Sequence, residues 1–327
     1  MCGRGPEGPQ LMRGPLGGHG ALGSYSEVSM QRGSLLSARA PFLCSLLLGC
    51  GADGAAPSED TGLHDRLVVE TGGGIGIMAP DGGQRRTIAI GSDLGHALSP
   101  AVSPDGRRIA FTGTKAGQLD LYVMDVDGSG RRQLTNDLAQ DLDPVWSPDG
   151  DSLLFTWTGS APGSPTMLVV IGTDGSGRRE LLVDGWGGDW SPDGRQIVFT
   201  GTGSRVRGLY LMDSDGSHVT SLREVCGSTC EDVGPRWSPD GQSLAFTRLL
   251  PDGTETVGVM RVDGTGARLV LPDSYTARPV WSPDGLRLAL TRLVGGTARI
   301  YILALESADT VSVSPGETWE FVSDWAR

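Results

Sequence analysis

The sequence predicts an all-β protein in which six four-stranded sheets close into a ring, and three observations lead to this prediction. The 327 residues include 51 glycines and 20 prolines, a composition typical of chains with many turns and few long helices. A motif made of a tight turn and an apolar strand recurs at nearly constant spacing. The two ends of the chain hold complementary parts of one further copy.

The recurring motif is Ser-Pro-Asp-Gly followed by an apolar strand. Its copies are AVSPDGRRIAF, VWSPDGDSLLF, DWSPDGRQIVF, RWSPDGQSLAF and VWSPDGLRLAL. One position before each turn forms an aromatic slot, which is also present at the C-terminus, and its occupants are Val102, Trp146, Trp190, Trp237, Trp281 and Trp325. These slots are 44, 44, 47, 44 and 44 residues apart, so the chain holds six repeats in phase.

Each repeat contains a second hairpin after the motif. Segments such as LYVMDVDGSGRRQLT from Leu121 and LYLMDSDGSHVTSL from Leu209 alternate apolar residues around a D-G turn, which predicts two further strands. Repeats of 40 to 50 residues with four antiparallel strands indicate the blades of a β-propeller. The sequence therefore predicts a six-bladed β-propeller.

The chain ends predict how the ring closes. Residues 66–70 (RLVVE) match the strand after the Ser-Pro-Asp-Gly turn, and the segments GIGIMAPDGG and RTIAI match the third and fourth strands. The C-terminal residues 319–327 supply the missing first strand, so we expect them to complete the last blade with residues 65–90. An open ring would leave strand edges exposed.

These motifs resemble the TolB-like, WD-repeat-like propeller family, whose blades carry a Trp-Ser-Pro-Asp-Gly turn before an apolar strand. The resemblance covers residues 65–327. TolB itself carries an α/β domain before its propeller, and we expect none here between Cys50 and the first strand. The first copy has Val102 in place of tryptophan, which is expected to weaken the packing between two blades.

The residues before the propeller are interpreted as an export signal. Residues 1–29 are rich in glycine and proline, and we expect them to be disordered or to precede the true start at Met30. Residues 30–50 look like a bacterial lipoprotein signal that ends in LLGC, with Cys50 as the lipidated residue. A plain secretory signal and a chance apolar stretch are the alternatives. Residues 51–64 are interpreted as a flexible tether, and the protein as an exported component of the bacterial cell envelope.

Charge and motifs limit the classes of partner and activity. A formal net charge of −12 argues against nucleic acid, and membrane contact is expected only through the lipid anchor. The motifs G-x-S-x-G, H-E-x-x-H, C-x-x-C and the Walker glycine-lysine pair are absent from the sequence. We expect no cofactor, no metal and a monomer.

Several acidic and cysteine motifs have a structural interpretation. The Ser-Pro-Asp-Gly residues suit a tight turn rather than a catalytic pair. Asp125 with Asp127, and likewise the pair in MDSDG, have a calcium-like spacing but no late glutamate, so hairpin turns are favoured. Cys226 and Cys230 lie in an enlarged loop, and a disulfide is favoured over free thiols or a metal site.

The connections between blades differ in sequence while the turns at the other end repeat, so we expect ligands at the variable end. The candidate ligand-face residues are Asp143, Asp189, Arg236, Arg278 and Asp324 near the axis, with Trp186, Tyr275 and Trp319 further out. The predicted function is that of a non-catalytic envelope protein that binds a protein or peptide, with a glycan as another possible ligand. The alternative is an exported hydrolase or lyase that acts on glycans or peptides through carboxyl groups near the axis.

Overall fold

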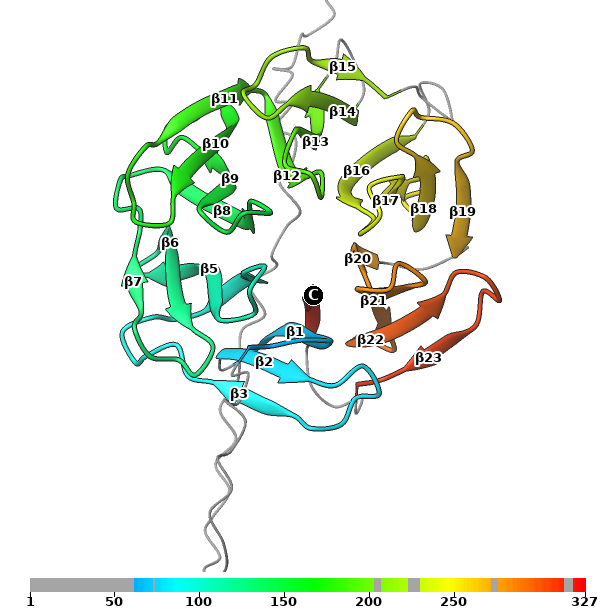
Figure 1. Cartoon of the computed structure of the whole chain (residues 1–327), viewed down its shortest axis with the longest axis horizontal. Coiled ribbons are helices and arrows are strands. Elements are labelled where there is room, and N and C mark those ends of the chain that lie inside the picture. Colours follow the sequence, from blue (N-terminus) through cyan, green and yellow to red (C-terminus); the bar gives the residue numbers. More distant parts are fainter. Residues whose placement is uncertain (1–61, 73, 203–206, 223–229, 272–275, 315–319) are drawn as a thin grey trace, which may run out of the picture. The chain divides into compact units, whose positions relative to one another are not determined.

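The computed structural model describes residues 62–72, 74–202, 207–222, 230–271, 276–314 and 320–327. Within these residues the chain forms strands and turns, and no segment forms a helix that could cross a membrane. The strands make six four-stranded antiparallel sheets around a central axis (Figure 1). The predicted six-bladed β-propeller is confirmed.

We number the sheets blades 1 to 6 in chain order and give each from its innermost strand outwards. Blade 1 consists of β24 (Phe321–Ala326), β1 (Arg66–Thr71), β2 (Gly74–Met78) and β3 (Arg86–Ile88). Blade 2 consists of β4 (Ala97–Val102), β5 (Arg108–Lys115), β6 (Gln118–Asp125) and β7 (Arg132–Gln133). Blade 3 consists of β8 (Gln140–Trp146), β9 (Ser152–Thr158), β10 (Thr166–Gly172) and β11 (Arg179–Val183).

The remaining blades repeat this order. Blade 4 consists of β12 (Gly185–Trp190), β13 (Gln196–Thr202), β14 (Arg207–Asp213) and β15 (Thr220–Ser221). Blade 5 consists of β16 (Glu231–Trp237), β17 (Ser243–Leu249), β18 (Glu255–Arg261) and β19 (Arg268–Leu271). Blade 6 consists of β20 (Thr276–Trp281), β21 (Arg287–Val294), β22 (Thr297–Ala304) and β23 (Thr310–Ser312).

Blade 1 joins the two ends of the propeller, as the sequence predicts. β24 pairs antiparallel with β1, with Leu67 opposite Trp325 and Glu70 opposite Phe321. The C-terminus lies beside β1 in Figure 1. This pairing covers the inner edge of β1, which would otherwise expose unpaired backbone groups.

The hydrophobic core lies between neighbouring blades, and the slot tryptophans belong to it. Trp146, for example, packs in one cluster with Leu121 of blade 2 and Phe155 of blade 3. Trp325 is 2% exposed in the cluster between blades 6 and 1. In the slot without tryptophan, Val102 shares its cluster with Leu63, which also donates a backbone hydrogen bond to Gly106. Leu63 therefore supplies apolar volume beside the smaller slot residue.

The Ser-Pro-Asp-Gly segments form tight turns at one end of the inner strands. In blade 3 the Ser147 hydroxyl donates to Asp149 Oδ1 at 2.5 Å and accepts from the Ser152 backbone N–H at 3.0 Å. Gly150 has φ +75°, a conformation that favours glycine. The same serine bonds recur in blades 2, 4, 5 and 6, at Ser103, Ser191, Ser238 and Ser282. The turn interpretation of this motif is confirmed.

Candidate functional site

The inner strands of blades 2 to 6 bulge at the same place, where two residues in each leave the regular pairing. We call the first of the two, three positions before the slot, the bulge residue. The bulge residues are Ser99, Asp143, Gly187, Gly234 and Arg278. The first four have φ between +48° and +61°. Glycine adopts this conformation freely, whereas serine and aspartate are strained in it. Such strain at Ser99 and Asp143 is typical of functional sites.

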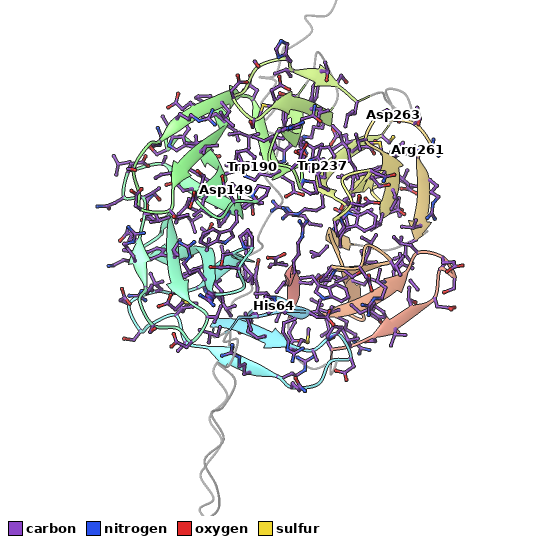
Figure 2. The ribbon with its side chains drawn as sticks, in the orientation of Figure 1. His64, Asp149, Trp190, Trp237, Arg261 and Asp263 are labelled. Carbon is purple, nitrogen blue, oxygen red and sulfur yellow. The ribbon has the colours of Figure 1, made fainter. Side chains whose placement is uncertain are left out.

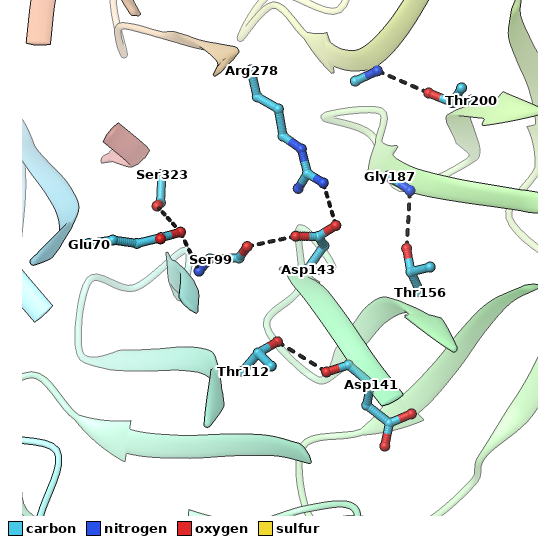
Figure 3. Close-up of polar contacts among 11 residues, drawn as sticks. Glu70, Ser99, Thr112, Asp141, Asp143, Thr156, Gly187, Thr200, Arg278 and Ser323 are labelled. Atoms are coloured by element: carbon cyan, nitrogen blue, oxygen red, sulfur yellow. Dashed lines mark hydrogen bonds and ion pairs between the residues drawn. The ribbon is translucent and has the colours of Figure 1, made fainter. Parts of the chain in front are cut away.

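Three of the bulge residues meet near the axis with Glu70 of β1 and Ser323 of β24 (Figure 3). We call this polar group the axial cluster; its members are Glu70, Ser99, Asp143, Arg278 and Ser323. The Arg278 guanidinium donates to Asp143 Oδ2, and the Ser99 hydroxyl donates to Asp143 Oδ1 at 2.6 Å. The Ser99 backbone N–H donates to Glu70 Oε1 at 2.7 Å, and the Ser323 hydroxyl lies 3.3 Å from the same oxygen.

The ion pair between Arg278 and Asp143 crosses the ring. Arg278 belongs to β20 of blade 6 and Asp143 to β8 of blade 3, and these blades face each other across the axis in Figure 1. The two side chains are 35% and 14% exposed. The pair thus places one positive and one negative group where a ligand that enters along the axis would meet both.

The two carboxyl groups of the axial cluster differ in their protonation. Burial alone would raise the pKa of Asp143, but the Arg278 guanidinium and the Ser99 hydroxyl outweigh burial and hold it below its usual value. Burial raises the pKa of Glu70 to about 7, and the Asp143 charge adds to this while the Ser99 N–H opposes it. At neutral pH Asp143 is therefore ionised and Glu70 is close to half protonated.

The other axial candidates link neighbouring blades. Asp189 accepts from the backbone N–H of Trp237 in the next blade at 2.7 Å, and Asp324 accepts from that of Val102 at 2.7 Å. Burial raises the pKa of both aspartates, and the Arg236 guanidinium opposes this shift in each. Arg236 lies 3.7 Å from Asp189. These aspartates therefore help to hold adjacent blades together as well as adding charge near the axis.

The aromatic candidates are only partly described. Trp186 lies at the start of β12, half-buried, with the Arg207 guanidinium 5.6 Å from its ring centre. Tyr275 and Trp319 lie outside the described residues, as does Cys50. A contribution of these three residues stays a prediction.

The remaining motifs are accounted for by local structure. In the turn that holds Asp125 and Asp127, the Gly128 N–H donates to Asp125 O and the Ser129 N–H to Asp127 Oδ1, as in an ordinary hairpin turn. Within the described residues, no three histidine, cysteine or acidic side chains are placed to hold a metal ion. Cys230 is buried and disulfide-bonded. Cys226 lies outside the described residues, so the pairing of these two cysteines stays a prediction.

The sequence-based candidates did not include Ser99, Ser323 or Glu70 of the axial cluster, and Glu70 is the one that departs from the repeat. Its place in the second strand of the blade is held in blades 2 to 6 by a threonine, at Thr112, Thr156, Thr200, Thr247 and Thr291. The hydroxyls of Thr156 and Thr200 accept from the backbone N–H groups of Gly187 and Gly234, the bond that Glu70 accepts from Ser99 (Figure 3). An alignment of the six second strands would have revealed this single departure.

Comparisons with known proteins agree with this architecture. A match to the TolB beta propeller domain covers residues 75–186 and 187–323. The chain belongs to the TolB β-propeller family. The Tol-Pal system protein TolB of Anaeromyxobacter dehalogenans strain 2CP-C is 51% identical over 41 residues, which are 12% of this chain and only 9% of that relative. The family resemblance predicted from the Trp-Ser-Pro-Asp-Gly turns is confirmed.

Two solved structures illustrate the range of proteins that share this propeller fold. TolB from Acinetobacter baumannii matches with a TM-score of 0.68 at 21% identity, over 83% of this chain and 68% of that one. An oligogalacturonate lyase from Vibrio parahaemolyticus matches with a TM-score of 0.55 at 12% identity, over 76% of this chain and 74% of that one. At these identities the likeness concerns the fold alone, and both a TolB and a lyase are built on it.

Proposed function

We propose that the protein is a non-catalytic binding or scaffold protein of the bacterial cell envelope and that it holds a segment of another protein, or a peptide, at the axial cluster. The observation that carries this proposal is the convergence of individual charged side chains from different blades on one axis. The pair Arg278 and Asp143, with Arg236 nearby, offers donors and acceptors for the backbone and chain ends of a polypeptide.

The repeat supports the proposal by contrast. The residues three positions before the slot are serine, aspartate, arginine and two glycines, while the turns at the other end of the same strands are identical. Ser99 and Asp143 keep a strained backbone that glycine adopts freely in two other blades. A purely structural repeat would have no reason to keep these side chains at the axis. Family membership agrees with a binding role, since the Tol-Pal system protein TolB is named as part of an assembly.

The test is capture from envelope extract with wild-type protein and with Arg278→Ala and Asp143→Ala. We expect both variants to lose at least tenfold of the specific capture because each removes one half of the pair across the axis. Arg107→Ala is the matched control, since Arg107 is exposed in the turn of blade 2, away from the axial cluster. Thermal unfolding must first show that all three variants fold. Equal capture by all four proteins would reject the axial site.

A second candidate function rests on the two protonation states of the axial carboxyl groups. A carboxyl with a pKa near 7 beside an ionised one is the arrangement of a general acid and a general base. Under this alternative the protein is an exported hydrolase or lyase for glycans or peptides, with Glu70 as acid and Asp143 as base. An oligogalacturonate lyase has the same fold, so the fold is compatible with an enzyme of this class.

Turnover decides between the two functions. Wild-type protein is incubated with panels of polysaccharides and peptides, alongside Glu70→Gln and Asp143→Asn. Cleavage by wild type that falls at least a hundredfold in both variants would establish the enzyme and overturn the non-catalytic proposal. No cleavage by wild type, together with capture that depends on Arg278, supports the binding protein.

We also propose that the protein is exported, acts as a monomer and is anchored through lipid on Cys50. The support is the LLGC sequence after an apolar run and the polar tether that follows. Metabolic labelling with a fatty acid should label the wild-type protein and leave Cys50→Ala unlabelled. Label that survives in Cys50→Ala would reject the anchor, and a dimer in sedimentation analysis would reject the monomer.

A further inference from the structure

A polar cavity lies between blades 3 and 4 at the turn end of the inner strands. Its volume is about 460 Å³, within the usual range of about 300–1,000 Å³ for small-ligand sites. Asp149 and Trp190, which Figure 2 shows near each other at this junction, line it together with Ser152, Arg179, Asp193 and Gly194. The cavity belongs to the turn end, so it is separate from the axial cluster and does not depend on the function proposed above.

The junction between blades 2 and 3 shows what fills the equivalent place there. Arg108, the sixth residue after the slot of blade 2, lies with its guanidinium carbon 4.7 Å from the ring centre of Trp146 in blade 3. Its Nη2 donates to the backbone oxygen of Gly150 at 3.1 Å. An arginine thus covers the slot tryptophan of the next blade and bonds to the neighbouring turn.

The junction between blades 6 and 1 repeats this arrangement with a different acceptor. Arg287, again the sixth residue after its slot, lies 5.0 Å from the ring centre of Trp325. Its Nη2 donates to Asp284 Oδ2 at 2.9 Å, in the turn of its own blade. A guanidinium in this position is therefore bound by an indole ring and by either of two acceptors.

Between blades 3 and 4 the arginine is replaced by Ser152 while the groups that bind it are kept. Trp190 is the tryptophan of the next blade, Gly194 is equivalent to Gly150, and Asp149 is equivalent to Asp284. All three line the cavity. The serine side chain is too short to reach them, so the cavity keeps the lining that binds an arginine side chain at the other two junctions.

The charge of the lining suits a cation. Hydrogen bonds from Ser147 and from the Asp151 backbone hold the pKa of Asp149 below its usual value, and those from Ser191 and the Arg195 backbone do the same for Asp193. Both are ionised at neutral pH. Among the described residues, Arg179 is the one cation in the lining, and its Nη2 donates to the backbone oxygen of Ser214, another lining residue, at 3.0 Å. Two carboxylates thus stand against one guanidinium that already has an acceptor. The net charge of −12 also attracts cations.

We propose that this cavity is a binding site for a guanidinium group, the side chain of an arginine presented by a partner polypeptide. The guanidinium would lie over Trp190 and donate to Gly194 O and to Asp149, as Arg108 and Arg287 do within the protein. A lysine fits less well, since its ammonium group is not planar and cannot stack on the ring while donating sideways.

The test measures binding of N-acetyl-L-arginine amide to the full chain, followed by the indole N–H signals of an NMR titration. We expect saturable binding that shifts the Trp190 indole signal, at least tenfold tighter than that of N-acetyl-L-lysine amide. Methylguanidinium should bind several-fold more weakly, because it lacks the stem that fills the cavity. Equal binding of methylguanidinium would overturn the assignment to a polypeptide arginine, and no saturable binding of any guanidinium would overturn the site.

Two matched substitutions test the role of the arginine: one fills the cavity between blades 3 and 4, and the other creates an equivalent cavity between blades 2 and 3. Ser152→Arg places an internal guanidinium over Trp190, so binding should fall at least tenfold while the melting temperature holds or rises. Arg108→Ser empties the junction at Trp146, so one more binding site should appear and the Trp146 indole signal should shift with it. If Ser152→Arg does not fold, the second substitution carries the test by itself. Unchanged binding in a folded Ser152→Arg, or an unchanged number of sites in Arg108→Ser, would overturn the proposal.

Discussion

The two ends of the inner strands differ in how much their residues and contacts vary from blade to blade. At the turn end, blades 2 to 6 repeat one set of serine, aspartate and glycine contacts with distances that agree within a few tenths of an ångström. At the axial end, the residue three positions before the slot is serine, aspartate, glycine, glycine and arginine in turn. Each inner strand of blades 2 to 6 thus has the same contacts at its turn end, whereas the residue at its axial end varies among the blades.

This difference has a physical cause. At the turn the chain must satisfy its own backbone groups in a tight space, and few residue combinations do so. At the axial end a bulge releases two residues per strand, including the bulge residue, from the pairing of the sheet. The ring then brings the side chains of Ser99, Asp143 and Arg278 together from three different blades. A repeat protein can therefore vary its site without changing its fold.

The largest effect is expected where the repeat closes the ring. Trp325→Ala should lower the free energy of unfolding by about 3–5 kcal/mol because it empties a buried tryptophan site. It also removes the hydrogen bond from Trp325 Nε1 to Asp65 Oδ1. Urea unfolding measures the loss, and Trp186→Ala, a half-buried tryptophan at the axial end, is the control. A smaller loss at Trp325 than at Trp186 would contradict the closure mechanism.

The next effect concerns the axial end and depends on pH. The pKa of Glu70 lies near 7 in the folded protein against 4.5 as its ordinary value, so the unfolded chain loses its proton first as pH rises. The wild-type protein therefore loses stability from about pH 4.5 to pH 7, on the order of 2 kcal/mol for a partly exposed group. Glu70→Gln should remove this loss in urea unfolding at pH 5 and pH 8. Glu70→Thr, which introduces the threonine found at this place in blades 2 to 6, should also remove the loss. The same pH dependence of stability in wild type and both variants would be inconsistent with a raised pKa of Glu70.

A smaller effect tests the constancy of the turn end. Ser147→Ala removes a bond donated to Asp149 and leaves the Ser152 N–H without its acceptor, which should cost about 1–2 kcal/mol. Because the contacts repeat, Ser191→Ala and Ser238→Ala should give the same loss within about 0.5 kcal/mol. Losses in chemical unfolding that differ more widely would show that the turns are not equivalent.

The smallest effect is expected at the axial bulge. Ser99→Gly removes the strain of a left-handed backbone, about 1–2 kcal/mol, which stabilises the folded protein. It also removes the hydrogen bond to Asp143 and raises the entropy of the unfolded chain, and both effects destabilise the folded protein. Stability should therefore change by less than about 1 kcal/mol, while capture of the envelope partner falls. A large loss of stability with unchanged capture would show that Ser99 serves the fold rather than the site.

Most of the fold could be predicted because it depends on local sequence. The spacing of the slot residues gave the number of blades, and the strands around Val68 and Trp325 predicted the closure that the register now confirms. The axial candidates are on the inner strands as expected. Glu70 was missed because its significance lies in its difference from a repeated threonine, and the pair of Arg278 with Asp143 because the residues are far apart in the chain.

The sequence by itself determined the repeat, its turn chemistry and the sharing of blade 1 between the two chain ends, since each follows from short-range periodicity and backbone requirements. Only the tertiary structure decided which charges meet across the axis, that burial moves the pKa of Glu70 to about 7, and that Ser152 leaves a cavity beside Trp190. These properties depend on distances between residues of different blades. Such distances are fixed only once the ring has closed.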